Sequence, residues 1–143
     1  MSEDKQTIIE ATGLSVDFWV DGEWVMAASG VNFKVGQGEV LAIVGESGSG
    51  KSTSAMSLLG LLPVNGRSAG SVKLRGEELV GAEKARLRQI RGKEIAAIFQ
   101  EPMTSLSQLH TIGDQICEAL HLHRDVSKRE GLRLVAEILG LVG

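Results

Sequence analysis

This sequence is short of several features that define whole classes of protein. It has one cysteine, Cys117, among 143 residues, so no internal disulfide can form and a reducing compartment is expected. No run approaches the roughly 18 consecutive apolar residues of a transmembrane helix. The opening residues, MSEDKQTIIEAT, lack the apolar stretch of a secretory signal. The net charge of −3 argues against a general nucleic-acid binder, so we expect no nucleic-acid partner.

One local segment is basic, between Glu83 and Glu94. Its cations are Lys84, Arg86, Arg88, Arg91 and Lys93. A solvated helix face is the simpler interpretation, and contact with an acidic partner surface is the alternative. No aromatic side chains alternate with these charges, as a surface for single-stranded nucleic acid would require.

The first half of the chain is rich in strand signals. Residues 7 to 20, TIIEATGLSVDFWV, predict a strand, and Asp21-Gly22 predicts a turn into a second strand that runs to about Val35. AGSVKLR, at 69 to 75, alternates and predicts another strand. VLAIV at 40 to 44 and EIAAIFQ at 94 to 100 are continuous apolar runs, which predict parallel strands buried on both faces.

Helical signals follow the glycine-rich stretch at residue 45 and dominate the tail. A helix is predicted from near Lys51 to Pro63, and a short charged one at 81 to 90. The tail, residues 111 to 142, predicts two amphipathic helices, which begin at the capping boxes Thr111-Asp114 and Ser127-Glu130. The pattern therefore predicts an α/β fold with a helical appendage.

The stretch GESGSGKST, from Gly45 to Thr53, fits the phosphate-binding pattern G-x-x-x-x-G-K-[ST]. Its glycines let the backbone adopt positive φ and approach an anion closely. Successive N–H groups from Gly48 to Thr53 can then point at a phosphate. Lys51 can reach the β- and γ-phosphates, and the Ser52 hydroxyl can bind Mg²⁺. An apolar run before the loop and a helix after it support binding of a nucleoside triphosphate.

A second polar position narrows the chemistry. Gln100 lies at the end of a predicted strand, and the following Glu101-Pro102 stops strand pairing because proline lacks an N–H. An amide at that end could orient water or complete a Mg²⁺ shell. The simpler alternative is a glutamine whose hydrogen bonds are satisfied at a strand end.

GESGSGKS, IFQEPMTSL and TIGDQI together resemble the ATPase subunits of ABC transporters, most closely the branch serving bacterial oligopeptide, dipeptide and nickel importers. The resemblance covers about Ile8 to Gly143. It implies a P-loop NTPase fold with an N-terminal antiparallel hairpin region, a nucleotide-binding core over 1–110 and the start of the helical subdomain over 111–143. It also assigns the ATP-binding Walker A loop to Gly45, Glu46, Ser47, Gly48, Ser49, Gly50, Lys51, Ser52 and Thr53.

The resemblance implies further roles. Gln100 would be the glutamine that senses Mg²⁺ and the γ-phosphate, and residues 101 to 112 would lie near the membrane permease. Trp24, in preference to Trp19, would stack on adenine. The partners implied are the permease, a second ATPase subunit and, indirectly, a periplasmic binding protein. The place implied is the cytoplasmic side of a bacterial inner membrane, with peripheral attachment through the permease.

Two departures from the family limit these expectations. Ser107-Gln108 replaces the usual Asn-Pro, which puts the local loop in doubt. No LSGGQ-type signature, Walker B carboxylates or switch histidine occurs in the 143 residues. We therefore expect ATP binding with poor hydrolysis, and apolar strands left uncovered. The alternatives are a non-catalytic nucleotide-binding or permease-docking module, complete at this length, and another P-loop enzyme such as a kinase, which FQEPMTSL disfavours.

Other candidate residues are weak. His121 and His123 are two apart on a predicted helix and point in different directions, so they make a poor metal pair. Cys117 lies beside the apolar stripe of the same helix and is predicted to be a small core residue.

Overall fold

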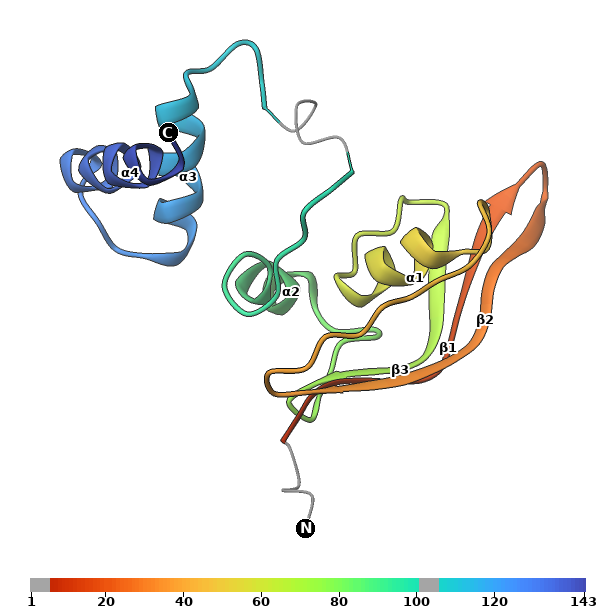
Figure 1. Ribbon diagram of the computed structural model, residues 1–143. Helices are drawn as coiled ribbons and strands as arrows, with labels where there is room; N and C mark the ends of the chain where they lie inside the picture. The colour runs from red at the N-terminus through yellow and green to blue at the C-terminus, as the bar shows by residue number, and fades with distance from the viewer. Residues whose placement is uncertain (1–5, 101–105) are drawn as a thin grey trace. The chain divides into compact units, whose positions relative to one another are not determined.

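The computed structural model describes residues 6–100 and 106–143 (Figure 1). The chain divides into two compact units, one ending at Leu87 and the other beginning at Arg88. The first unit holds a four-stranded antiparallel sheet in the order β2-β1-β3-β4. The strands are β1 Thr7–Val20, β2 Glu23–Gly36, β3 Gly66–Leu74 and β4 Glu77–Glu78.

The hairpin of β1 and β2 turns at the predicted place. Val20 pairs with Glu23, so Asp21 and Gly22 form a two-residue loop, and both have positive φ, 50° and 90°. Such a turn matches the right-handed twist of the strands, and Asp-Gly is a preferred pair for it. The hairpin and the predicted third strand are confirmed.

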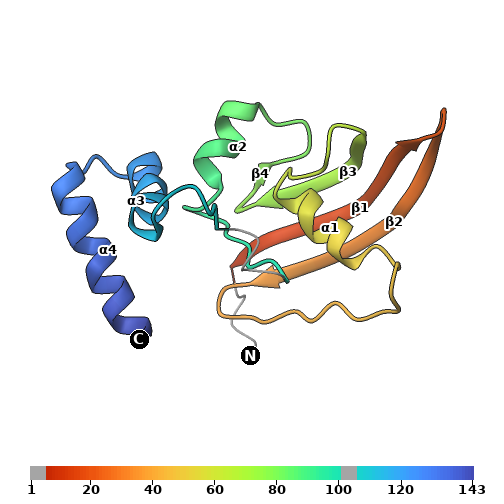
Figure 2. The ribbon, with the colours of Figure 1, turned by 90° about the horizontal axis from the view of Figure 1, so that it is seen from above.

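The core of the first unit lies between this sheet and α1, Lys51–Leu58, which covers one face of the sheet (Figures 1 and 2). Its buried apolar side chains are Ala11, Leu14, Val16, Leu59, Val72, Leu74 and Leu79. Each fully buried valine or leucine contributes roughly 1.5–3 kcal/mol. Local pairing and this shared apolar layer therefore hold the sheet together.

Helix α1 ends earlier than the predicted Pro63. The Gly60 amide donates to the Ser57 carbonyl at 3.0 Å, and the Leu61 amide donates to the Met56 carbonyl at 2.9 Å. Gly60 has φ 60°, the left-handed conformation that this C-terminal motif requires. The predicted end of the helix is therefore wrong, because glycine stops the helix before proline does.

The carboxylate of Glu78 secures the short edge of the sheet. It accepts hydrogen bonds from the Ser71 hydroxyl at 2.5 Å and from the amides of Val72 and Val80 at 2.9 and 3.0 Å. Burial raises the pKa of this carboxyl, but the hydrogen bonds outweigh burial and hold the pKa below its ordinary value.

The two apolar runs predicted to be buried parallel strands are not strands. Residues 40–44 and 96–99 have no regular secondary structure, and Val40 and Ile98 are 98% and 97% exposed. In the described parts of the chain the only parallel pairing outside the named strands is an isolated bridge between Arg91 and Ile95. A parallel strand needs a neighbour reached by a long crossover, and no described segment supplies one. This prediction is wrong.

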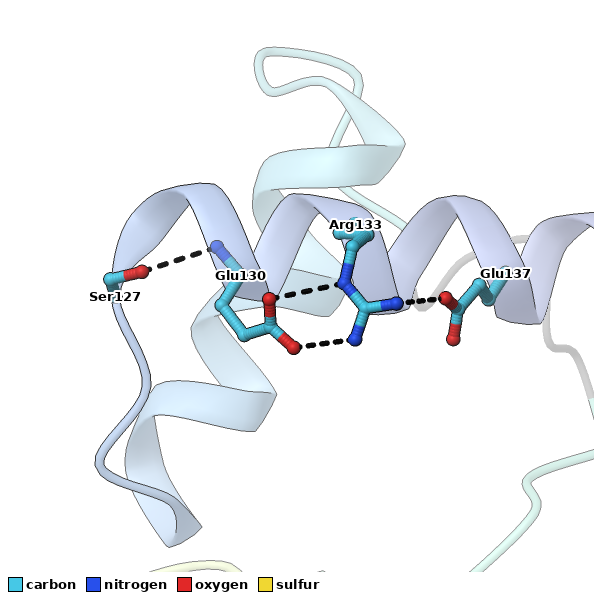
Figure 3. Close-up of polar contacts among 4 residues, drawn as sticks. All are labelled: Ser127, Glu130, Arg133 and Glu137. Carbon is cyan, nitrogen blue, oxygen red and sulfur yellow. Dashed lines mark hydrogen bonds and ion pairs between the residues drawn. The ribbon is translucent and has the colours of Figure 1, made fainter.

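The second unit begins within the short helix α2, Lys84–Ile90, and ends with α3, Ile112–His123, and α4, Lys128–Val142. The Asp114 amide donates to the Thr111 hydroxyl at 3.1 Å, and the Glu130 amide donates to the Ser127 hydroxyl at 3.3 Å (Figure 3). Both predicted N-caps are confirmed, and each satisfies an amide that the helix leaves unpaired.

Helices α3 and α4 pack through a small-residue contact. A Cβ placed on Gly131 would lie 2.5 Å from the Cys117 sulfur, so α4 approaches α3 more closely than any side chain at 131 would permit. Cys117 and Val135 are buried there. The prediction that Cys117 is a core residue is confirmed.

The outer face of α4 carries a ladder of charges. Arg133 lies between Glu130 and Glu137 and donates to both carboxylates (Figure 3). The hydrogen bonds from Arg133 lower the pKa of Glu130, and both glutamates raise the pKa of Arg133. All three groups are exposed, so this ladder stabilises the helix only slightly.

Candidate nucleotide-binding loop

The glycine-rich loop, residues 45–50, leads directly into α1. Gly48 and Gly50 have φ of 79° and 84°, and the Ser49 amide closes a turn on the Glu46 carbonyl at 3.2 Å. Gly50 is the N-cap of α1 and offers no side-chain oxygen to the first-turn amides. Those amides and the positive end of the helix dipole are therefore available to an anion.

Lys51 folds back across the loop. Its Nζ donates to the carbonyls of Gly45 and Glu46, at 2.8 and 2.5 Å, and lies 3.3 Å from the Ser49 Oγ. These contacts hold the positive charge of Lys51 at the opening of the loop, and none of the three partners is an acidic side chain. The same carbonyls are weak anchors for a cation, so a phosphate anion offers Lys51 a stronger partner.

A small cavity opens beside the loop. It has a volume of about 160 Å³ and is lined by Ala27, Gly48, Ser49, Gly50, Lys51, Ser52 and Thr53. Six residues of the predicted loop therefore line one cavity. Gly45 and Glu46 do not line it, but their carbonyls accept the hydrogen bonds that hold Lys51 there. Pockets for whole drug-sized ligands measure roughly 300–1,000 Å³, so this cavity suits phosphate groups and not a whole nucleotide.

The residues present fit Mg²⁺ together with a nucleotide phosphate chain. A Cβ placed on Gly48 would meet nothing within 4 Å, so the loop leaves open space there. The Ser52 hydroxyl is exposed and supplies the kind of oxygen ligand that Mg²⁺ takes alongside phosphate oxygens. In the described ranges no group of three or more His, Cys, Asp or Glu side chains could hold a metal by itself.

Trp24 lies in an aromatic cluster on the hairpin. Its ring contacts Trp19 edge-on at a centroid distance of 5.2 Å, and the Arg67 guanidinium lies 3.8 Å from the Trp24 ring centroid. Arg67 is anchored to Asp17 at 3.0 Å. This cation–π contact could not be predicted from the sequence, because it depends on the register that places Asp17 opposite Arg67.

The strand register also assigns this cluster to a face of the sheet. Trp19 and Asp17 alternate with the fully buried Val16, so they point to the other face. Trp24 pairs with Trp19 and shares that face. One side of the Trp24 ring is covered by Arg67, so an adenine would need the other side. The stacking role of Trp24 stays a prediction.

Gln100 lies at an exposed bend in the second unit, not at the end of a strand. The position predicted for it is therefore wrong, because the run that precedes it is not paired. Residues 101–105, which include the Glu101-Pro102 step and the first part of the segment expected near the permease, lie outside the described residues. The role of Gln100 with Mg²⁺ stays a prediction.

Curated relatives of this chain are named for peptide transport or peptide import. An oligopeptide transport ATP-binding protein of Mycobacterium bovis is 46% identical over 95% of this chain and 22% of its own length. A putative peptide import ATP-binding protein of Brucella abortus is 48% identical over 94% of this chain and 41% of its own length. The chain therefore spans between about a fifth and two fifths of these relatives.

Another relative, a probable peptide ABC transporter ATP-binding protein of Sinorhizobium fredii, is 44% identical over 94% of this chain and 41% of its own length. None of the helices in the described segments is long and apolar enough to cross a membrane. The sequence model of the ABC transporter family matches residues 28–142, which include the whole phosphate loop and both C-terminal helices. The chain belongs to the ABC transporter family, and its fold class is the α/β P-loop NTPase class of that family.

Proposed function

We propose that these 143 residues are the nucleotide-binding portion of an ATP-binding subunit that drives an importer for peptides or related small solutes. The observation that carries the proposal is the formed phosphate loop, with Lys51 across its mouth and unpaired helix amides beside it. The names of the relatives support import of peptides as the process that ATP would drive.

Within this proposal each residue of the loop has a role set by its chemistry. The amides from Gly48 to Thr53 would donate to phosphate oxygens, and Lys51 would leave the Gly45 and Glu46 carbonyls for the β- and γ-phosphates. The Ser52 hydroxyl and Gln100 would be ligands of Mg²⁺, which neutralises phosphate charge when bound. Trp24 would stack on adenine.

The proposal separates binding from turnover. Hydrolysis of a phosphoanhydride depends on carboxylates that position the attacking water and stabilise the developing charge. The sequence holds no Walker B, signature or switch-histidine pattern that could supply them. These residues would therefore bind ATP in the presence of Mg²⁺ but hydrolyse it poorly, since binding alone does not favour the transition state.

The proposed organisation follows the family. Residues 1–110 would form the nucleotide-binding core and residues 111–143 the start of the helical subdomain. Partners would be the permease subunits, a second ATPase subunit and, indirectly, a periplasmic binding protein, at the cytoplasmic side of a bacterial inner membrane. The exposed apolar runs at 40–44 and 96–99 favour this organisation over a nucleotide-binding or docking module that is complete at this length.

Equilibrium titration of the purified chain with MgATP tests the proposal. We expect saturable binding that Lys51→Ala weakens by about tenfold or more, because a charge-assisted contact to phosphate is lost. Lys73→Ala is the matched control, since Lys73 is an exposed lysine of β3 and should leave binding unchanged. Equal binding by wild type and Lys51→Ala would refute the site, and sustained hydrolysis lost on Lys51→Ala would refute binding without turnover.

A further inference from the structure

Strand β2 contains an extra residue at the point where it passes the phosphate loop. Val16 of β1 pairs with Ala28, and the next residue, Asp17, pairs with Met26, so Ala27 has no partner across the pair. This is a β-bulge, which bends a strand and redirects its backbone groups. The bulge cannot be read from the sequence, because Ala27 and Ala28 are ordinary residues in an apolar stretch.

The bulge contacts Gly50. A Cβ placed on Gly50 would lie 2.3 Å from the Ala27 carbonyl oxygen and 3.3 Å from the Ala28 Cβ. At Gly48, whose φ is nearly the same, a Cβ would meet nothing within 4 Å. The loop is therefore in tight contact with β2 at Gly50 and free of close neighbours at Gly48.

Gly50 also controls the direction of the phosphate-binding groups. It is the N-cap of α1, and its carbonyl accepts the first helical hydrogen bond, from the Ser54 amide at 2.8 Å. A shift of Gly50 would turn the first-turn amides and the start of the helix with it. The residues that hold Gly50 in place therefore also set the direction in which the first-turn amides point.

We infer that Ala27 and Ala28 are positioning residues for the phosphate loop, an inference that rests on the proposed function. The Ala27 carbonyl and the Ala28 methyl group pack against Gly50 and set how closely it approaches β2. Ala28 pairs with the fully buried Val16 and so points to the face of the sheet that α1 covers. It acts on phosphate only through Gly50.

Small side chains are required for this role. Extra methyl groups on residue 28 would enter space next to Gly50, and a packed neighbour must then move. The β2 backbone is held by pairing with β1, whereas the loop is not part of the sheet. The loop is therefore the part that moves, and ligand affinity should fall more than the stability of the fold.

The test compares Ala28→Val with Ala69→Val, the same substitution at an exposed position of β3. Binding of Mg²⁺-tripolyphosphate and of MgATP is measured for each variant, with thermal unfolding as the folding check. We expect Ala28→Val to weaken both ligands by the same factor, about tenfold. Ala69→Val should bind both as the wild type does.

Equal affinity in wild type and Ala28→Val would overturn the inference. Loss of ATP binding with tripolyphosphate binding intact would overturn it too, because residue 28 would then contact the nucleoside end. If the wild-type chain binds neither ligand, the proposed function itself would be contradicted.

Ala28→Gly covers the case in which the valine variant fails to fold, since it removes the methyl group and cannot clash. Amide hydrogen exchange in the ligand-free chain should become faster over residues 46–53 of this variant, and unchanged exchange there would overturn the inference without any ligand.

Discussion

Segments of this chain with similar β propensity differ in structure: some are paired and buried, and others are unpaired and exposed. Strands β1, β2 and β3 pair with one another and bury a common apolar layer, in which Leu14 is fully buried. The runs 40–44 and 95–99 are just as rich in β-branched and apolar residues, yet Val40 is 98% exposed. The difference is not in composition.

What differs is the source of the partner strand. A two-residue turn joins β1 to β2, so the partner strand of β1 is its neighbour in the sequence. A parallel strand needs a neighbour that arrives through a crossover of a dozen residues or more. No described segment gives either run such a neighbour. An apolar run thus identifies side chains that are more stable when buried, but it does not show that the chain supplies a segment to bury them.

The largest effect expected from this comparison is at Leu14. Leu14→Ala should lower the free energy of unfolding by about 2–5 kcal/mol, because it leaves a cavity in the core. Val44→Ala, in a side chain 87% exposed, should change it by less than about 0.5 kcal/mol. Urea denaturation measures both variants. A loss at Val44 as large as that at Leu14 would show that the run 40–44 is covered in solution.

An intermediate difference, between two glycine variants, is expected where the loop meets the paired sheet. Gly48→Ala and Gly50→Ala both place a side chain at positive φ, at a cost of roughly 1–2 kcal/mol each. Only Gly50→Ala also drives a methyl group against the Ala27 carbonyl, which should add about 1–3 kcal/mol. Thermal unfolding of the ligand-free variants checks the order, and equal losses would mean that β2 does not contact the loop.

The smallest effect concerns the edge of the sheet and depends on pH. The pKa of Glu78 is lowered, so its contribution to stability is present above the ordinary carboxyl pKa and is lost as pH falls through the lower value. Glu78→Gln should therefore lower the melting temperature by a few degrees at neutral pH.

The gap between wild type and Glu78→Gln should close as the pH is lowered below about 4. Glu83→Gln, at an exposed glutamate in the same unit, is the matched control. A gap that persists unchanged in acid would show that the Glu78 hydrogen bonds do not depend on its charge.

Features decided by neighbouring residues could be predicted from the sequence. The Asp21-Gly22 turn and the caps at Thr111 and Ser127 are confirmed because each depends on residues within four positions of one another. The phosphate loop is contiguous, so its residues could be named together. The predicted end of α1 at Pro63 is too late, although Gly60 is a possible signal for the earlier end.

Features decided by register or by distant partners could not be predicted. The two apolar runs and the place of Gln100 at a strand end both assumed pairing that the described residues do not provide. Arg67 on the Trp24 ring and the Ala27 bulge beneath Gly50 follow from how strands align. A shift of one residue would remove either contact, and no local pattern fixes such a shift.

Amide hydrogen exchange of the chain with and without MgATP tests the central claim most directly: the hairpin sheet and phosphate loop are formed while the apolar runs are uncovered. Strands β1 and β3 should exchange slowly, residues 40–44 should exchange rapidly, and MgATP should slow exchange over residues 46–54. Slow exchange at 40–44 in the ligand-free chain, or no effect of MgATP on the loop, would contradict the account.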